Sequence, residues 1–121
     1  MANILIVDDS PTETHILTAM LEKNGFVVST AASGEEGIEK AKSEKPDLIL
    51  MDVVMPGMNG FQAARSISNE SETSTIPIII VSTKDQETDK MWGLRQGAKD
   101  YVTKPADEKE LMGKINTLLG N

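Results

Sequence analysis

Short apolar runs alternate with longer amphipathic stretches five times along this chain of 121 residues. Three of the runs, Ile4–Val7, Leu48–Met51 and Ile78–Val81, are continuously apolar and too short to be helices. Two further runs, Phe26 to Thr30 and Tyr101–Thr103, also contain residues that favour strands. Strands that are apolar throughout are typical of parallel sheets buried on both faces. The alternation therefore predicts an α/β fold of five βα units, with helices on both sides of one parallel sheet.

Each amphipathic stretch begins with a residue that can cap a helix by accepting the backbone N–H of the residue three positions on. The predicted capping pairs are Ser10 with Glu13, Ser33 with Glu36, Asn59 with Gln62, Thr83 with Gln86, and Asp107 with Glu110. Pro11 also suits the first position of a helix. Stop signals place three helix ends at Asn24-Gly25, before Pro46 and near Gly97.

Helical periodicity predicts which side chains of the helices face the sheet. The expected inner residues are Ile16, Leu17, Met20 and Leu21 in the first helix, and Leu111, Ile115 and Leu118 in the last. The polar segment Ser68 to Thr75 is predicted to be a mobile loop. Trp92 is expected to pack on the sheet or a loop, and His15 to be exposed or partly packed.

Length and charge limit the classes of function open to the chain. We expect one domain over residues 1–121 with no output domain, because 121 residues leave no room for a second core. The net charge of −7 disfavours binding to nucleic acid or to an anionic membrane. No apolar stretch approaches the roughly 18 residues that span a bilayer, and no signal peptide precedes the first strand. A cytoplasmic protein is therefore expected.

Polar residues follow four of the predicted strands, at the point where each strand ends. Asp8 and Asp9 follow the first strand, Asp52 the third, Ser82 the fourth and Lys104 the fifth. In open α/β sheets the ligand site lies outside the carboxyl ends of the strands. We therefore expect three carboxylates, a hydroxyl and an ammonium to meet at one edge of the sheet.

The chemistry of that cluster points to phosphoryl transfer with a metal ion. Three neighbouring carboxylates cannot all stay ionised without a cation, and Mg²⁺ is the natural one because it prefers oxygen ligands. Asp52 is then the candidate nucleophile, since carboxylates form aspartyl phosphates. Lys104 supplies positive charge for the phosphoryl oxygens, and Ser82 supplies a hydroxyl donor.

Several motifs together resemble the response-regulator receiver family. They are Val7-Asp8-Asp9-Ser10, Met51-Asp52-Val53-Val54-Met55-Pro56-Gly57, Asn59-Gly60, Ser82 and Lys104-Pro105. The resemblance covers the whole chain and includes the motifs in order. It implies a flavodoxin-like (βα)5 three-layer sandwich with strand order 2-1-3-4-5.

The resemblance also implies a role for each matching residue. Asp52 is the phosphoacceptor, which takes its phosphoryl group from a sensor histidine kinase, and Lys104 contacts that group. The implied Mg²⁺ site consists of Asp8, Asp9, Asp52 and the backbone carbonyl of Val54. The implied switch residues are Ser82 and Tyr101, the implied phosphoryl-contacting backbone belongs to Val53 and Thr83, and Lys104-Pro105 is expected to be a cis bond.

By the same resemblance the chain is a phosphoacceptor with self-catalysed phosphotransfer and slow autodephosphorylation, rather than an enzyme. The segment Thr83–Lys90 with Trp92-Gly93 resembles stand-alone regulators of type IV pilus twitching motility. A downstream protein is expected to bind the face made by the fourth helix, fifth strand and fifth helix, and the chain to be a monomer or weak dimer. Thr83, Val54 and Ala106 depart from residues common in the family. By the resemblance, Thr83 implies tighter access to the site, and Val54 puts phosphatase-assisted dephosphorylation of the chemotaxis type in doubt.

Other functions remain open at this point. A flavodoxin-like FMN carrier would need a hydroxyl- and glycine-rich loop in place of Asp8-Asp9-Ser10-Pro11. An aspartate-nucleophile phosphatase would need a D-x-D motif after the first strand, whereas Asp8 and Asp9 are adjacent. A phosphate sink for a shared kinase and a constitutive docking module would both keep the receiver fold.

Overall fold

The structure is a computed structural model that describes residues 1–120 and contains five strands and five helices in strict alternation. The strands are β1 (Asn3–Val7), β2 (Val27–Ala31), β3 (Leu48–Met51), β4 (Ile78–Ser82) and β5 (Asp100–Thr103). The helices are α1 (Pro11–Lys23), α2 (Gly34–Glu44), α3 (Gly60–Asn69), α4 (Glu87–Arg95) and α5 (Glu108–Leu119). Each predicted element is present, and its boundaries agree with the sequence pattern to within a few residues.

The five strands form one parallel sheet in the order β2-β1-β3-β4-β5, which confirms the predicted topology. The three continuously apolar runs are the three central strands, because only central strands are covered on both faces and paired on both edges. The two less apolar runs became the edge strands β2 and β5.

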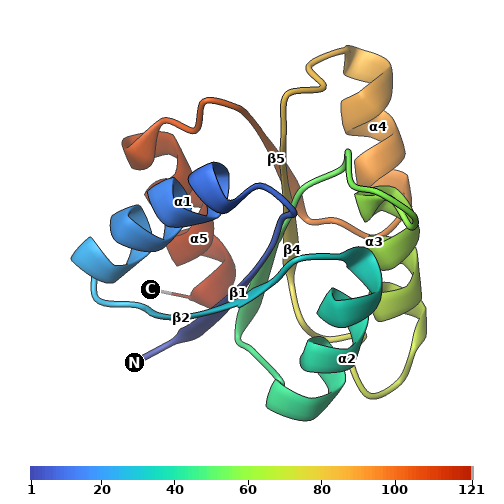
Figure 1. Cartoon of the computed structure of the whole chain (residues 1–121), viewed down its shortest axis with the longest axis horizontal. Helices are drawn as coiled ribbons and strands as arrows, with labels where there is room; N and C mark the ends of the chain where they lie inside the picture. Colours follow the sequence, from blue (N-terminus) through green and yellow to red (C-terminus); the bar gives the residue numbers. More distant parts are fainter. Residues whose placement is uncertain (121) are drawn as a thin grey trace.

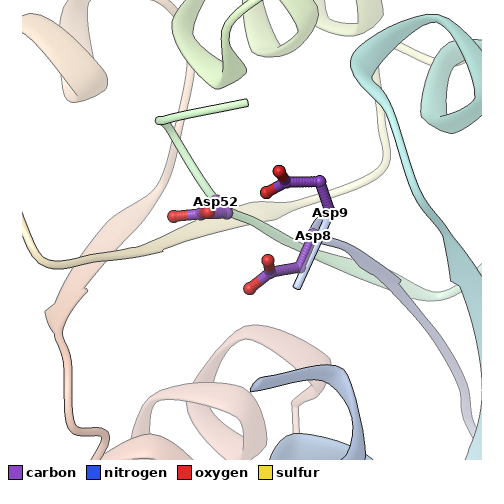
Figure 2. Close-up of side chains that lie close together, drawn as sticks. All are labelled: Asp8, Asp9 and Asp52. Atoms are coloured by element: carbon purple, nitrogen blue, oxygen red, sulfur yellow. The ribbon is translucent and has the colours of Figure 1, made fainter. Parts of the chain in front are cut away.

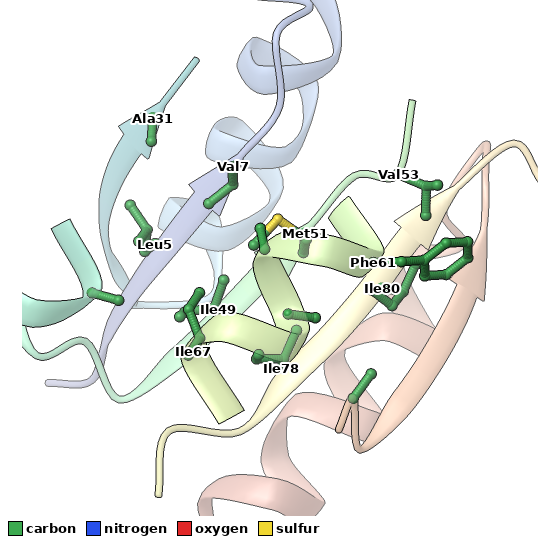
Figure 3. Packing of buried hydrophobic residues seen from close by; sticks show 14 of the residues in the cluster. Leu5, Val7, Ala31, Ile49, Met51, Val53, Phe61, Ile67, Ile78 and Ile80 are labelled. Carbon is green, nitrogen blue, oxygen red and sulfur yellow. The ribbon is translucent and has the colours of Figure 1, made fainter. Parts of the chain in front are cut away.

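Two apolar layers sandwich the sheet, with α1 and α5 on one face and α2, α3 and α4 on the other (Figure 1). Alternate residues of β1 enter different layers: Leu5 and Val7 pack towards α2 and α3, whereas Ile4 and Ile6 pack towards α1 and α5. Figure 3 shows the first layer, in which Phe61 of α3 lies beside Ile80 of β4. The paired layers hold the carboxyl ends of the strands in a fixed array.

Four of the five predicted caps are confirmed, at Ser10, Ser33, Asn59 and Asp107. The prediction for α4 is wrong: the helix begins at Glu87 and not after Thr83. The backbone of Lys84 is already bonded elsewhere, since its N–H donates to Ser82 Oγ and its carbonyl accepts from the Tyr101 hydroxyl. These two bonds hold the segment as a loop, and helix formation starts only beyond it.

Three further predictions about packing need correction. Ile16 is exposed, because one residue step along a helix turns it about 100° away from the stripe that Leu17 begins. The segment from Ser68 to Thr75 is not a plain loop, since α3 continues through Asn69. Thr73 within it is buried, and its hydroxyl donates to the Ile67 carbonyl at 2.6 Å.

Trp92 was expected to pack on the sheet or a loop, and this is also wrong. Its side chain is 47% exposed, next to the similarly exposed Met91 and Leu94 of α4. Gly93 is the α4 residue that meets the sheet, because a Cβ there would touch Tyr101, Ile80 and Phe61. His15 is exposed, as expected. Within residues 1–120, no helix combines the length and apolar composition that crossing a membrane requires.

Candidate functional site

Two neighbouring strands bring three carboxylates together at the carboxyl edge of the sheet. Val7 at the end of β1 is in register with Met51 at the end of β3, so the residues that follow leave the sheet side by side. Oxygens of Asp8, Asp9 and Asp52 lie within 4.8 Å of one another. Figure 2 shows the three side chains gathered beyond the two strands. The predicted convergence of these aspartates is therefore observed.

Lys104 enters the cluster from the loop after β5. Its ammonium donates to Asp8 Oδ2 at 2.8 Å and lies 3.6 Å from Asp52 Oδ1. The Lys104 side chain is only 8% exposed and that of Asp8 only 2%, so water screens this ion pair poorly. The lysine predicted to contact a phosphoryl group is thus held against Asp8 and within ion-pair distance of Asp52.

The environment of Asp52 disfavours its ionised form. The pKa of Asp52 is raised to about 6, chiefly by burial and next by the negative charge of Asp8, while Lys104 acts in the opposite direction. One lysine therefore does not fully compensate three clustered carboxylates. A site of this kind would gain from an additional cation.

Backbone contacts fix the position of Asp52. Its N–H donates to the Val7 carbonyl at 2.9 Å, which extends the pairing of β1 and β3 by one residue. On the other side, the Gly60 N–H donates to the Val53 carbonyl at 2.9 Å and brings the start of α3 against this loop. Val53 is buried and Val54 is 59% exposed, so consecutive residues after Asp52 face opposite environments.

The predicted switch residues lie beside one another on β4 and β5. Ser82 is fully buried, and its Oγ accepts the Lys84 N–H at 3.2 Å. Tyr101 is buried, with its hydroxyl donating to the Lys84 carbonyl at 2.7 Å. Burial also raises the pKa of Tyr101. Both side chains thus hold the same loop, the one that joins β4 to α4.

Three other features considered in the sequence can be located in the structure. Thr83 is exposed at the start of the β4–α4 loop, next to buried Ser82. The Lys104-Pro105 bond is cis, as the resemblance implied. His15 lies on α1 in a surface hollow that Asp8 and Asp9 also line.

Glu13 is a member of this site that the sequence pattern does not indicate. The pattern predicts only its capping pair with Ser10, yet its Oε2 lies 3.7 Å from Lys104 Nζ. No sequence signal links the two, because they are far apart in the chain and meet only through the packing of α1 beside the β5–α5 loop.

Comparisons with known proteins agree with this geometry. Residues 4–116 match the family described as the response regulator receiver domain. The chain is 63% identical over 119 residues to protein PilH of Pseudomonas aeruginosa PAO1, which covers 98% of this chain and 98% of PilH. Other curated relatives are longer, and the chain spans 48% of one and 26% of another.

Solved structures share the whole fold. Chemotaxis protein CheY4 of Vibrio cholerae superposes with a TM-score of 0.90 and 31% identity, over 98% of each chain. The receiver domain of sensor histidine kinase PA1611 from Pseudomonas aeruginosa superposes with a TM-score of 0.91 and 30% identity, over 99% of this chain and 98% of that chain. That structure has a magnesium ion coordinated in its active site cleft. Fold, sequence match and relatives converge, and the chain belongs to the response regulator receiver domain family of two-component systems.

Proposed function

We propose that this chain is a response regulator whose Asp52 accepts a phosphoryl group from the phosphohistidine of a sensor histidine kinase. One observation carries the proposal: a buried carboxylate lies 3.6 Å from a buried ammonium, inside a cluster of three carboxylates. Phosphoryl acceptance is general in the receiver family, and the family match spans residues 4–116. That span also supports a single receiver domain in this sequence.

The proposed reaction needs Asp52 in its ionised form. An oxygen of its carboxylate attacks the phosphorus, a P–O bond forms, and the P–N bond to the kinase histidine breaks. The imidazole nitrogen leaves with the bonding electron pair and takes up a proton from water. Lys104 offsets the charge that develops on the phosphoryl oxygens, and Ser82 with the backbone of Val53 and Thr83 is proposed to bind those oxygens.

The donor set fits a Mg²⁺ ion. Asp8, Asp9 and Asp52 offer clustered carboxylate oxygens, which are ligands that Mg²⁺ prefers. The raised pKa of Asp52, caused first by burial, supports the need for a cation. We propose that Asp9, Asp52 and the Val54 carbonyl hold the ion, with Asp8 beside them. Bound Mg²⁺ would neutralise the cluster towards an incoming phosphoryl group.

We further propose that the pathway is type IV pilus twitching motility or related chemotaxis-like signalling. The 63% identity to PilH over 98% of both chains supports this assignment. A downstream protein is proposed to bind the face of α4, β5 and α5. The exposed Met91 and Trp92 of α4 support such a contact, because exposed aromatic residues are frequent interface anchors.

The buried position of Tyr101 favours a second candidate, a phosphate sink for a shared kinase. By the family resemblance Ser82 and Tyr101 act as a switch, in which Ser82 would move towards the phosphoryl group and Tyr101 would fill the space that it leaves. The Tyr101 ring, however, is already buried and its hydroxyl is bonded to the Lys84 carbonyl. If the Tyr101 ring is buried before phosphorylation, phosphorylation would change the conformation of α4 and β5 less, and the change available as a signal would be smaller. The two candidates share the same chemistry at Asp52 and differ in whether α4 responds.

Intact-mass analysis with acetyl phosphate tests the proposal. The wild-type chain should gain one phosphoryl group when Mg²⁺ is present, and EDTA should prevent the gain. Asp52→Asn should not be labelled, whereas the matched variant Asp85→Asn, at an exposed loop carboxylate, should be labelled normally. Labelling of Asp52→Asn at Ser82, Thr83 or His15 would show that the nucleophile is wrong.

A further inference from the structure

Three carboxylates surround the Lys104 ammonium, and they come from three different elements. Asp8 follows β1 and accepts its hydrogen bond at 2.8 Å, while Asp52 follows β3 and lies at 3.6 Å. Glu13, in the first turn of α1, lies at 3.7 Å on Oε2. Glu13 is the outermost member, with a side chain 36% exposed against 2% for Asp8 and 11% for Asp52. Lys104 is therefore shared between two inner carboxylates and one at the rim.

The cap of α1 explains why the Glu13 carboxylate is available for this contact. In a complete capping box the glutamate side chain would accept the N–H of the cap residue. Here the Ser10 N–H donates to Asp8 Oδ1 at 2.9 Å instead. Ser10 Oγ still accepts the Glu13 N–H at 3.3 Å, so the backbone of Glu13 stays anchored while its side chain is free to extend. Asp8 thus accepts hydrogen bonds from both the Ser10 N–H and the Lys104 ammonium.

An ammonium group has three protons to donate, and its partners compete for them. A phosphoryl group on Asp52 would bring new anionic oxygens close to Lys104. The hydrogen bond from Lys104 to Asp8 is short and buried, so we expect it to persist when Asp52 carries a phosphoryl group. The Glu13 contact is longer and more exposed, so it is the one that a phosphoryl oxygen replaces at the lowest cost.

We propose that Glu13 is a positioning residue for Lys104, which holds the ammonium towards α1 in the resting state and competes for it with phosphoryl oxygens on Asp52. The inference rests on the proposed phosphoacceptor function. It adds a residue outside the acidic cluster that tunes how strongly the site retains its phosphoryl group. Removing the Glu13 carboxylate should strengthen binding of a phosphoryl group without adding any contact to it.

Beryllofluoride, a stand-in for the phosphoryl group, provides the test in the presence of Mg²⁺. Its affinity, measured by calorimetry, should rise about 2- to 5-fold in Glu13→Gln, which corresponds to the loss of one partly exposed competing charge. The effect should vanish in a Lys104→Met background, because it acts through the ammonium. Glu35→Gln is the matched control: Glu35 is also a first-turn glutamate, in α2, and pairs with no cation in residues 1–120.

A second readout tests the resting contact independently of ligand binding. The Lys104 Nζ resonance in the free protein should shift in Glu13→Gln and stay in place in Glu35→Gln. Equal effects of the two variants on affinity, or a Glu13→Gln effect that persists in Lys104→Met, would overturn the proposal while leaving the function of Asp52 standing. A wild-type chain that binds no beryllofluoride at all would overturn the phosphoacceptor function and the proposed competition together.

Discussion

The first residue of α3, Gly60, lies directly against the backbone of Asp52. A Cβ at Gly60 would sit 1.8 Å from the Asp52 carbonyl oxygen and 2.9 Å from the Val53 Cα. These are backbone atoms on the loop that carries the candidate phosphoacceptor, so they cannot give way without displacing it. The approach is secured by the Gly60 N–H, which donates to the Val53 carbonyl. Glycine at this position therefore lets α3 begin close enough to support Asp52.

Gly60→Ala should destabilise the fold by about 3 kcal/mol, because the added methyl forces the Asp52 loop or α3 to move. It should also slow labelling by acetyl phosphate, since the carboxylate shifts with its backbone. Urea denaturation and intact-mass labelling measure the two effects. Gly113→Ala is the control, as a Cβ there meets nothing within 4 Å, and it should add roughly 0.5–1 kcal/mol of stability. Equal effects of the two substitutions would contradict this account of Gly60.

Asp52→Asn should stabilise the metal-free protein at neutral pH. The pKa of Asp52 is raised to about 6, chiefly by burial, and lies above the unfolded value of about 3.9. The folded state therefore binds the proton more tightly, and the stability due to protonated Asp52 is lost as pH rises from about 4 to 6. In EDTA at neutral pH the variant should exceed the wild type by on the order of 2 kcal/mol, and the gap should close near pH 4.

Thermal denaturation across pH measures this difference, with Asp85→Asn as the control at an exposed loop carboxylate. Added Mg²⁺ should stabilise the wild type more than Asp52→Asn, because a ligand that binds only the folded state raises its stability. If Asp52→Asn is less stable than the wild type in EDTA at neutral pH, then the ionised Asp52 carboxylate does not destabilise the metal-free folded state.

Tyr101→Phe should lower stability by about 1 kcal/mol through loss of the hydrogen bond to the Lys84 carbonyl at 2.7 Å. The loss should be local, since the ring still fills its place against Gly93. Amide hydrogen exchange should therefore quicken in residues 83–86 and stay unchanged in β1. Unaltered exchange in that loop would mean that the Tyr101 hydroxyl does not hold it.

Beryllofluoride binding should perturb the amide resonances of α4 more than those of α1 if the chain signals by a change of shape. Ser82 is the proposed link, because its Oγ holds the Lys84 N–H and a phosphoryl oxygen would draw it away. Ser82→Ala should weaken the response of α4 while leaving shifts around Asp9 intact. Shifts confined to the loops at Asp9 and Asp52, with α4 and Tyr101 silent, would instead support the phosphate sink.

The strands and the polar residues that end them were predictable because both depend on local pattern. Four-residue runs such as Leu48–Met51 are too short for helices, and their continuous apolar character requires cover on both faces. Parallel strands in one sheet end at one edge, so Asp8, Asp9 and Asp52 were expected on the same edge, and the pairing of β1 with β3 brings them together there. The strand order itself came from resemblance to a known family, since sequence periodicity does not rank parallel strands.

The errors came where local pattern competes with contacts from distant residues. Thr83 has the right spacing from Gln86 for a cap, but the Tyr101 hydroxyl and Ser82 Oγ bind the intervening Lys84 backbone and delay α4 to Glu87. Trp92 is apolar enough to be buried, yet Gly93 occupies the contact with the sheet and leaves Trp92 facing solvent.

The sequence by itself determined which residues reach the carboxyl edge of the sheet, because strand length, apolar period and chain order are properties of neighbouring residues. Only the tertiary structure decided which carboxylates pair with Lys104 and at what distances. Lys104 lies closest to Asp8, lies further from Asp52, and extends its reach to Glu13. These distances depend on how α1 and the β5–α5 loop pack across the sheet, and ion-pair energies change steeply with both separation and burial.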